Sequence, residues 1–153
     1  MKEKTKNALA WLAPGAAVLA ADRLAKRFLT GVTKPLIPGV IGLKPARNTG
    51  MALGLLQGNT ALIIAVSVLL AALCLWIVRG TRIRGLGRCA LSMMAGGALG
   101  NLWDRIVLGW VQDMFELLFM DFYIFNAADV GVVAGAALCG VSLLLRPRDW
   151  SRK

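Results

Sequence analysis

Two aspartates in this sequence, Asp113 and Asp129, have surroundings that suit acid–base chemistry. Each follows an apolar stretch, and neither has a lysine or arginine within four residues along the chain. Two carboxyl groups held close together in a poorly solvated site cannot both ionise easily, so they share a proton. The ionised member can then activate a water molecule while the protonated member polarises a carbonyl group, which is the chemistry that amide hydrolysis requires. Spacing alone leaves open the alternative that these are solvated acids in an outer loop.

The composition limits the other kinds of active site. The sequence has no histidine, which excludes serine–histidine and cysteine–histidine catalysis and every histidine-ligated metal site. The three cysteines, Cys74, Cys89 and Cys139, lie within or at the end of apolar runs, and we interpret them as small apolar side chains. Carboxylates, lysines and hydroxyl groups remain as the available catalytic side chains.

The composition also indicates a membrane environment. Hydrophobic residues make up 58% of the chain and charged residues 17%, against roughly 25% charged residues in a soluble globular domain. A length of 153 residues fits one domain, so we expect residues 1–153 to form a single integral membrane domain. The 18 lysines and arginines against 8 acids would suit nucleic-acid binding. However, the basic residues gather at the flanks of apolar runs, which is the pattern of membrane topology, and we expect no nucleic-acid partner.

Four apolar runs are about long enough to cross a hydrocarbon core, which needs roughly 17 to 25 helical residues. We expect transmembrane helices at about 8–29, 60–79, 87–107 and 127–146. Basic clusters at the N-terminus, at residues 79–88 and at the C-terminus then fall on one side of the membrane, which marks that side as cytoplasmic. Both termini are therefore predicted to be cytoplasmic, and residues 30–59 and 108–126 are predicted to face outward.

The outward segments differ from ordinary linkers. Residues 32–58 are rich in glycine, proline and β-branched residues, which favours short strands and turns over helix. Aromatic residues concentrate between Trp110 and Phe125, as in segments at the level of the lipid headgroups, and we expect this link to act as a lid. The expected fold class is an all-α membrane protein with four transmembrane helices and a small outward-facing β/loop subdomain.

Six of the eight acidic residues gather toward the outward side when they are placed on these helices. They are Asp22, Asp104, Asp113, Glu116, Asp121 and Asp129. A carboxylate at the centre of a membrane helix costs roughly 2.5–3.5 kcal/mol on insertion scales, so acids inside spans are functional or paired. Asp22 has Lys26 four residues on, and Asp104 has Arg105 beside it on the helix face that also carries Asn101. For Asp22 and Asp104 we favour structural ion pairing, or shaping of a substrate site, over direct chemistry.

Four stretches of the sequence, in this order, resemble the motifs of lipoprotein signal peptidases, also called signal peptidases II. They are residues 22–26 (DRLAK), 48–52 (NTGMA), 96–113 (GGALGNLWDRIVLGWVQD) and 125–129 (FNAAD). The first stretch is a weak signal alone, whereas the last two together are highly specific. The resemblance implies an aspartic endopeptidase of the bacterial cytoplasmic (inner) membrane, with its active site near the outer face.

By the same resemblance, Asp113 and Asp129 are the catalytic pair. The residues expected to bind substrate or to support this pair are Asp22, Lys26, Asn48, Gly50, Asn101, Asp104, Arg105 and Asn126. The implied substrates are prolipoproteins with a diacylglyceryl-modified cysteine, and cleavage of the bond before this cysteine releases the signal peptide. The signal helix is expected to lie along the first, third and fourth transmembrane helices. We expect no metal or organic cofactor, membrane lipids and globomycin-type inhibitors as further partners, and a monomer.

Two other functions fit parts of this pattern. A small proton- or cation-coupled membrane carrier would also hold acids within its helices. It would not explain why the acids gather at one face while residues 61–78 carry no charge. An inactive scaffold of the same fold would keep the motifs without turnover. Binding of a globomycin-type inhibitor would distinguish a peptidase from a carrier.

Overall fold

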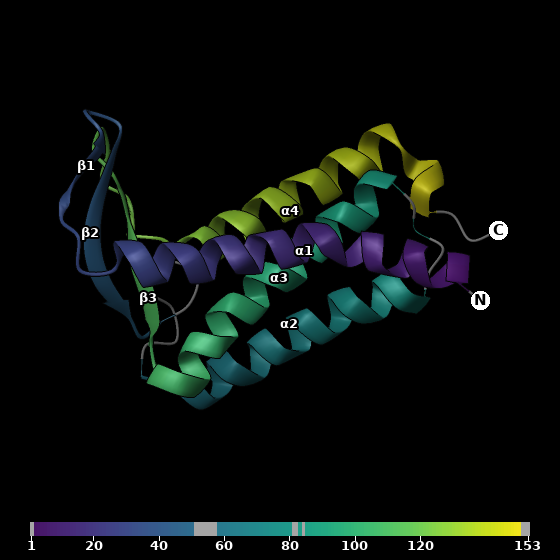
Figure 1. Ribbon diagram of the computed structural model, residues 1–153, viewed down its shortest axis with the longest axis horizontal. Helices are drawn as coiled ribbons and strands as arrows, with labels where there is room; N and C mark the ends of the chain where they lie inside the picture. Colours follow the sequence, from purple (N-terminus) through teal and green to yellow (C-terminus); the bar gives the residue numbers. More distant parts are fainter. Residues whose placement is uncertain (1, 51–57, 81–82, 84, 151–153) are drawn as a thin grey trace.

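Four long helices form a bundle, and a small sheet covers one end of it (Figure 1). The computed structural model describes residues 2–50, 58–80, 83 and 85–150. The helices are α1 (Lys2–Leu29), α2 (Thr60–Gly80), α3 (Gly85–Leu108) and α4 (Ala127–Leu145), followed by a short 3₁₀ helix, η1 (Pro147–Trp150). The four predicted helices are confirmed as helices, although α1 begins nearer to the N-terminus than expected. Both termini lie at the end of the bundle opposite the sheet (Figure 1).

The central helix of the bundle is α3. It packs against α1, α2 and α4, and α1 also contacts α4. Glycines make two of these contacts close. A methyl group added at Gly96 would collide with the backbone of Gly15 on α1, and one added at Gly97 would collide with the carbonyl oxygen of Ala128 on α4. Small residues thus bring the helix backbones together, as is usual for helices that pack within membranes.

The sheet joins the two segments that were predicted to face outward. It contains β1 (Lys34–Ile37), β2 (Ile41–Asn48) and β3 (Val111–Leu117), antiparallel and in this order. The strands β1 and β2 confirm the prediction for the first outward segment, of which residues 51–57 lie outside the described residues.

The third strand was not predicted. It belongs to the aromatic-rich link, for which only a lid at headgroup level was expected. In the register of β2 and β3, Ala46 pairs with Asp113 and Asn48 pairs with Val111. This pairing brings Asn48 from the first outward segment close to Asp113 in the second.

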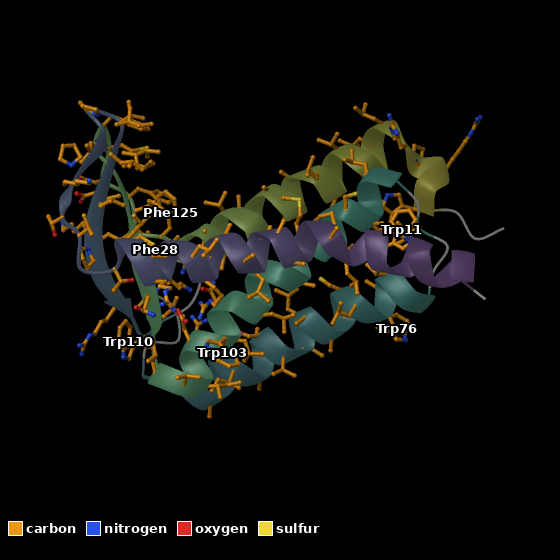
Figure 2. All side chains as sticks on the ribbon, in the orientation of Figure 1. Trp11, Phe28, Trp76, Trp103, Trp110 and Phe125 are labelled. Atoms are coloured by element: carbon orange, nitrogen blue, oxygen red, sulfur yellow. The ribbon has the colours of Figure 1, made fainter. Side chains whose placement is uncertain are left out.

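Two helices of the described chain are long and apolar enough to cross a membrane, over Thr60–Val78 and Ala127–Leu145. Large apolar side chains on both helices are exposed, among them Leu69, Trp76 and Leu144. Aromatic side chains lie at both ends of the bundle, with Phe28 and Trp110 near the sheet and Trp11 and Trp76 near the termini (Figure 2). This arrangement resembles the aromatic belts of membrane proteins. That all four helices span the membrane stays a prediction.

Candidate active site

Asp113 and Asp129 meet where the sheet joins the helix bundle. Asp113 lies on β3, and its side chain points with that of Val111 toward the bundle, where both are buried. Asp129 lies in the first turn of α4 and is half-buried. Asn126, which is fully buried, precedes α4 and lies between the two aspartates in the hydrogen-bond network.

Each oxygen of Asp113 accepts one hydrogen bond from an asparagine side chain. Asn48 Nδ2 donates to Oδ2 at 2.9 Å, and Asn126 Nδ2 donates to Oδ1 at 2.6 Å. Because Asn48 ends β2 and Asn126 is the N-cap of α4, the Asp113 carboxyl is held from both the sheet and the bundle.

Each oxygen of Asp129 also accepts a hydrogen bond from an amide. Asn101 Nδ2 on α3 donates to Oδ1 at 2.7 Å, and the backbone N–H of Asn126 donates to Oδ2 at 3.1 Å. In return Asn126 Oδ1 accepts from the Asp129 N–H at 2.9 Å, so the two residues form a capping box at the start of α4. Asn126 Nδ2 also donates to Asn101 Oδ1 at 2.9 Å, which closes a network of both aspartates and two asparagines.

The donors to this pair are all neutral. In the described part of the chain no lysine or arginine lies within ion-pair distance of Asp113 or Asp129. Burial, and after it the negative charge of Asp129, raises the pKa of the Asp113 carboxyl to about 7, while the hydrogen bonds from Asn48 and Asn126 oppose this rise. Such a carboxyl can hold or release a proton near neutral pH, as a general acid or base must.

The other two buried aspartates are ion-paired. Arg23 and Lys26 of α1 each contact both Asp22 and Asp104, over distances of 2.6 to 3.0 Å. The expected pair of Asp22 with Lys26 is confirmed. The expected pair of Asp104 with Arg105 is wrong, because the packing of α1 against α3 supplies Asp104 with two cations from another helix.

This ion-paired cluster also holds the backbone beside both candidate catalytic residues. Asp22 Oδ1 accepts from the N–H of Ala128, the residue before Asp129, at 3.2 Å. Asp104 Oδ2 accepts from the N–H of Gln112, the residue before Asp113, at 3.1 Å. Asp22 and Asp104 therefore contact the chain directly behind the pair and not the pair itself.

Arg105 supports the site through backbone carbonyls. Its guanidinium donates to the carbonyl oxygen of Gly50 at 2.7 Å and, more weakly, to that of Asn101 at 3.4 Å. The Gly50 N–H donates to Asn48 Oδ1 at 2.9 Å, which orients the Asn48 amide toward Asp113. Met51 and Ala52 of the same motif lie outside the described residues.

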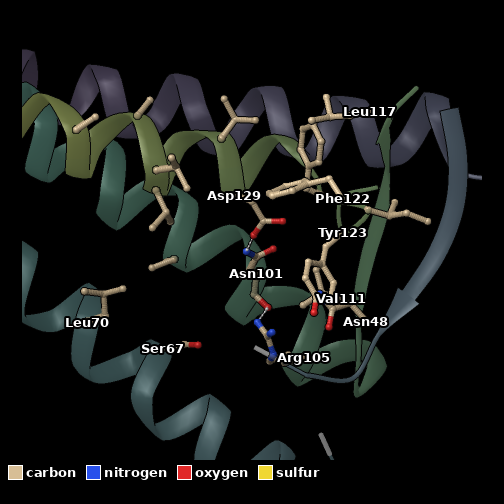
Figure 3. Close-up of a pocket in the computed structure, with 18 residues that line it drawn as sticks. Asn48, Ser67, Leu70, Asn101, Arg105, Val111, Leu117, Phe122, Tyr123 and Asp129 are labelled. Atoms are coloured by element: carbon tan, nitrogen blue, oxygen red, sulfur yellow. Dashed lines mark hydrogen bonds between the residues drawn. The ribbon is translucent and has the colours of Figure 1, made fainter. Parts of the chain in front are cut away.

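A cavity of about 690 Å³ borders Asp129. Its wall is mostly apolar and comes from α2, α3, α4 and residues 122–125, with Ser67 and Leu70 of α2 across from Asp129 (Figure 3). The polar side chains on this wall include Asn48, Asn101 and Arg105. The signal helix was expected to lie along α1, α3 and α4. This cavity is instead lined by α2, α3 and α4, and no described residue of α1 contributes to its wall.

The structure thus brings together all ten residues predicted for the site, in two layers. Asp113, Asp129 and the three asparagines form the inner network, and Gly50 and Arg105 orient Asn48. In the outer layer, Asp22 and Asp104 accept hydrogen bonds from the backbone N–H groups of Ala128 and Gln112, and Lys26 is ion-paired with both aspartates. Sequence reasoning did not assign a role to Arg23, since no local spacing shows that its guanidinium reaches Asp104 on α3. The described residues contain no cluster of three or more histidine, cysteine or acidic side chains suited to a metal ion.

The chain is similar to known proteins over most of its length. Residues 15–145 match the family model described as signal peptidase (SPase) II. A lipoprotein signal peptidase of Clostridium acetobutylicum is 34% identical over 134 residues, which cover 82% of this chain and 87% of that protein. One of Desulfitobacterium hafniense is 35% identical over 146 residues, which cover 92% and 95% of the two chains.

The fold is also shared with a solved structure. A bacterial membrane enzyme superposes with a TM-score of 0.82 at 24% identity, covering 94% of this chain and 93% of its own. The family match and the relatives' identities together lead to one conclusion: this chain belongs to the signal peptidase II family of peptidases.

Proposed function

We propose that this protein removes signal peptides from diacylglyceryl-modified prolipoproteins by cleaving the bond before the lipidated cysteine. Relatives that cover most of the chain are lipoprotein signal peptidases, which supports the substrate class. The observation that carries the catalytic assignment is the contrast among the four buried aspartates. Among the described residues, Asp113 and Asp129 accept hydrogen bonds from neutral groups alone and line cavities, whereas Asp22 and Asp104 are ion-paired and line neither cavity.

The proposed reaction uses one proton shared by the pair. Asp129, at the N-terminus of α4 where negative charge is favoured, takes a proton from water as the water oxygen bonds to the scissile carbonyl carbon. Asp113, whose pKa is raised to about 7, gives its proton to the carbonyl oxygen. When the carbon–nitrogen bond breaks, Asp129 protonates the leaving amine and a hydroxyl of the intermediate returns a proton to Asp113. The pair is then restored without a covalent intermediate.

The other eight predicted site residues act as supports in this proposal. Asn48, Asn101 and Asn126 fix the directions of the carboxylates, and Arg105 with Gly50 fixes Asn48. The cluster of Asp22, Lys26 and Asp104 holds the backbone behind both aspartates. A carrier would need mobile or exchangeable intramembrane acids, so the ion pairs of Asp22 and Asp104 argue against that alternative.

Signal peptidases II are membrane enzymes, and this chain has apolar helices. We propose a single integral domain that crosses the bacterial cytoplasmic membrane four times and works as a monomer, surrounded by membrane lipids. Both termini would be cytoplasmic, and the sheet and active site would be outside.

With the native cysteines replaced by alanine, an impermeant thiol reagent added to intact cells is expected to label Thr33→Cys on the sheet side and not Pro147→Cys. The reverse labelling would reject this topology.

Cleavage of a diacylglyceryl-modified prolipoprotein in detergent tests the activity. The wild type should release the signal peptide, and globomycin should inhibit it. Asp113→Asn and Asp129→Asn should each lower the rate by roughly 10²- to 10⁴-fold, because each removes one partner of the acid–base pair. Asp149→Asn, in η1 at the opposite end of the bundle, is the matched control and should keep its activity. Substantial turnover by Asp113→Asn would contradict its catalytic role.

A further inference from the structure

A second cavity, of about 490 Å³, lies on the sheet side of the candidate catalytic pair. Unlike the first cavity, it is bordered by charged side chains from β2, β3 and the link that follows β3. They are Lys44, Arg47, Glu116 and Asp121, and Asp113 itself lines the same cavity.

The two cavities meet at the catalytic pair. Asp129 lines the apolar cavity and Asp113 lines the charged one. Five residues line both cavities and form their common boundary, namely Asn48, Leu117, Phe122, Tyr123 and Ile124. Asn48, Phe122 and Tyr123 are seen on the same side of the apolar cavity as Asp129, across from Ser67 and Leu70 (Figure 3). A peptide that crosses the pair would thus pass from apolar to charged surroundings.

This change of surroundings matches the change within a prolipoprotein, whose apolar signal segment precedes the cleaved bond and whose hydrophilic mature segment follows it. We propose that the charged cavity binds the first residues after the cleaved bond, and that Arg47 and Asp121 select among substrates by their charge. The inference rests on the proposed function, because it assigns a second part of the same substrate to a second part of the site.

Two of the four charges are available to a substrate. Lys44 and Glu116 lie 3.4 Å apart and largely neutralise each other. Arg47 is exposed and its guanidinium lies 4.8 Å from the ring centre of Trp110, which steadies it without cancelling its charge. Asp121 is also exposed, and neither it nor Arg47 has an ion-pair partner in the parts of the chain that the structure describes.

The mixture of charges favours a peptide over a lipid headgroup as the occupant. An anionic phosphate drawn to Lys44 and Arg47 would also meet the carboxylates of Glu116, Asp121 and Asp113. A polypeptide can present donors to these acids and acceptors to the bases along the same stretch, so it satisfies both kinds of group.

The test compares two prolipoproteins that differ only in the second to fourth residues after the cleaved bond, acidic in one and basic in the other. The measured quantity is the ratio of kcat/KM for the acidic substrate to that for the basic one. Arg47→Gln should lower this ratio by about two- to five-fold and Asp121→Asn should raise it by a similar factor, as expected for exposed charge pairs. High salt should reduce both effects.

Arg27→Gln is the matched control. Arg27 also contacts an aromatic ring, that of Phe28 at 6.0 Å, but it lines neither cavity, so its replacement should leave the ratio unchanged. Unchanged ratios in both Arg47→Gln and Asp121→Asn would overturn this inference while leaving the proposed cleavage intact. Effects that are equal for both substrates and that follow the anionic lipid content would also overturn it, in favour of a lipid contact. A wild type that cleaves neither substrate would overturn the proposed function itself.

Discussion

The two candidate catalytic carboxylates differ from the other buried acids in the groups that touch them. Asp22 and Asp104 each contact charged nitrogens of Arg23 and Lys26. Among the described residues, Asp113 and Asp129 accept hydrogen bonds only from neutral amide groups, which fix the direction of each oxygen. Asparagine is therefore suited to hold a pair that must share one proton.

Replacing Asn48 with alanine tests this role of the amide donors. The Asn48 hydrogen bond lowers the pKa of Asp113, so its loss should raise that pKa above the present value of about 7. Turnover needs one proton on the pair and falls when Asp113 loses it. The alkaline limb of the plot of kcat against pH should therefore move upward by about one pH unit.

Asn59→Ala is the control for this measurement. Asn59 accepts a hydrogen bond from the Leu62 N–H at the start of α2 and lies in neither cavity wall, so its loss should not move the limb. A limb that stays in place in Asn48→Ala, or that moves to lower pH, would show that this amide does not tune Asp113.

At the scale of the elements, the helices could be predicted because long apolar runs and basic flanks are visible in the sequence itself. The strand β3 could not, because its buried and half-buried positions do not alternate and it carries two acids, Asp113 and Glu116. Its partner β2 comes from residues far away in the sequence, before α2, and the two strands pair with an irregularity between Leu43 and Ala46. No local sequence pattern predicts a strand pairing of this kind.

The same limit explains the incorrect partner for Asp104. Spacing along one helix suggested Arg105, which in fact donates to carbonyl oxygens. The cations that reach Asp104 come from α1, which lies close to α3 where Gly15 meets Gly96. The catalytic pair could be proposed from the sequence because both aspartates lack local cations. The asparagines around the pair were identified through the family motifs alone.

Close packing between α3 and α4 sets the position of Asp129. A methyl group at position 97 would collide with the carbonyl oxygen of Ala128, the residue before Asp129. Gly97→Ala should therefore displace the first turn of α4. A misplacement of about 1 Å can cost roughly 10²-fold in rate, and we expect a loss of kcat near that size. The assay compares kcat at equal amounts of folded protein in detergent.

Gly140→Ala is the matched control on α4. A methyl group there meets no described atom within 4 Å beyond its chain neighbours and the nearby backbone of α4 itself, so both folding and activity should persist. If Gly97→Ala were as active as Gly140→Ala, the first turn of α4 would have to tolerate displacement, and the tight contact with α3 would not position the pair.

At the scale of the whole molecule, the arrangement of helices leaves the pair open to an apolar substrate. Both α2 and α4 pack against α3, and the apolar cavity lies between them, with Asp129 on its wall (Figure 3). The sheet then covers the pair from the other direction and supplies Asp113 and Asn48. Burying Asp113 in this junction serves the proposed chemistry but must cost stability whenever the carboxyl is ionised.

The free-energy cost of burying an ionised Asp113 should appear as a dependence of folding stability on pH. The pKa of Asp113 is about 7 in the folded protein, against an ordinary value of 3.8. Below pH 3.8 both states are protonated and the cost is absent. As pH rises from about 4 to about 7 the unfolded state ionises first, so folding stability falls by about 4 kcal/mol in total and stays at the lower level above that range.

Melting temperatures in detergent at several pH values between these limits measure the slope, and Asp113→Asn should flatten it. The variant loses one good hydrogen bond, because an amide cannot accept from both Asn48 and Asn126. That penalty is the same at every pH, so it lowers the whole curve without changing its slope. A slope that persists undiminished in Asp113→Asn would mean that other acids account for the pH dependence and that Asp113 is ionised at neutral pH. The role of proton donor would then pass to Asp129.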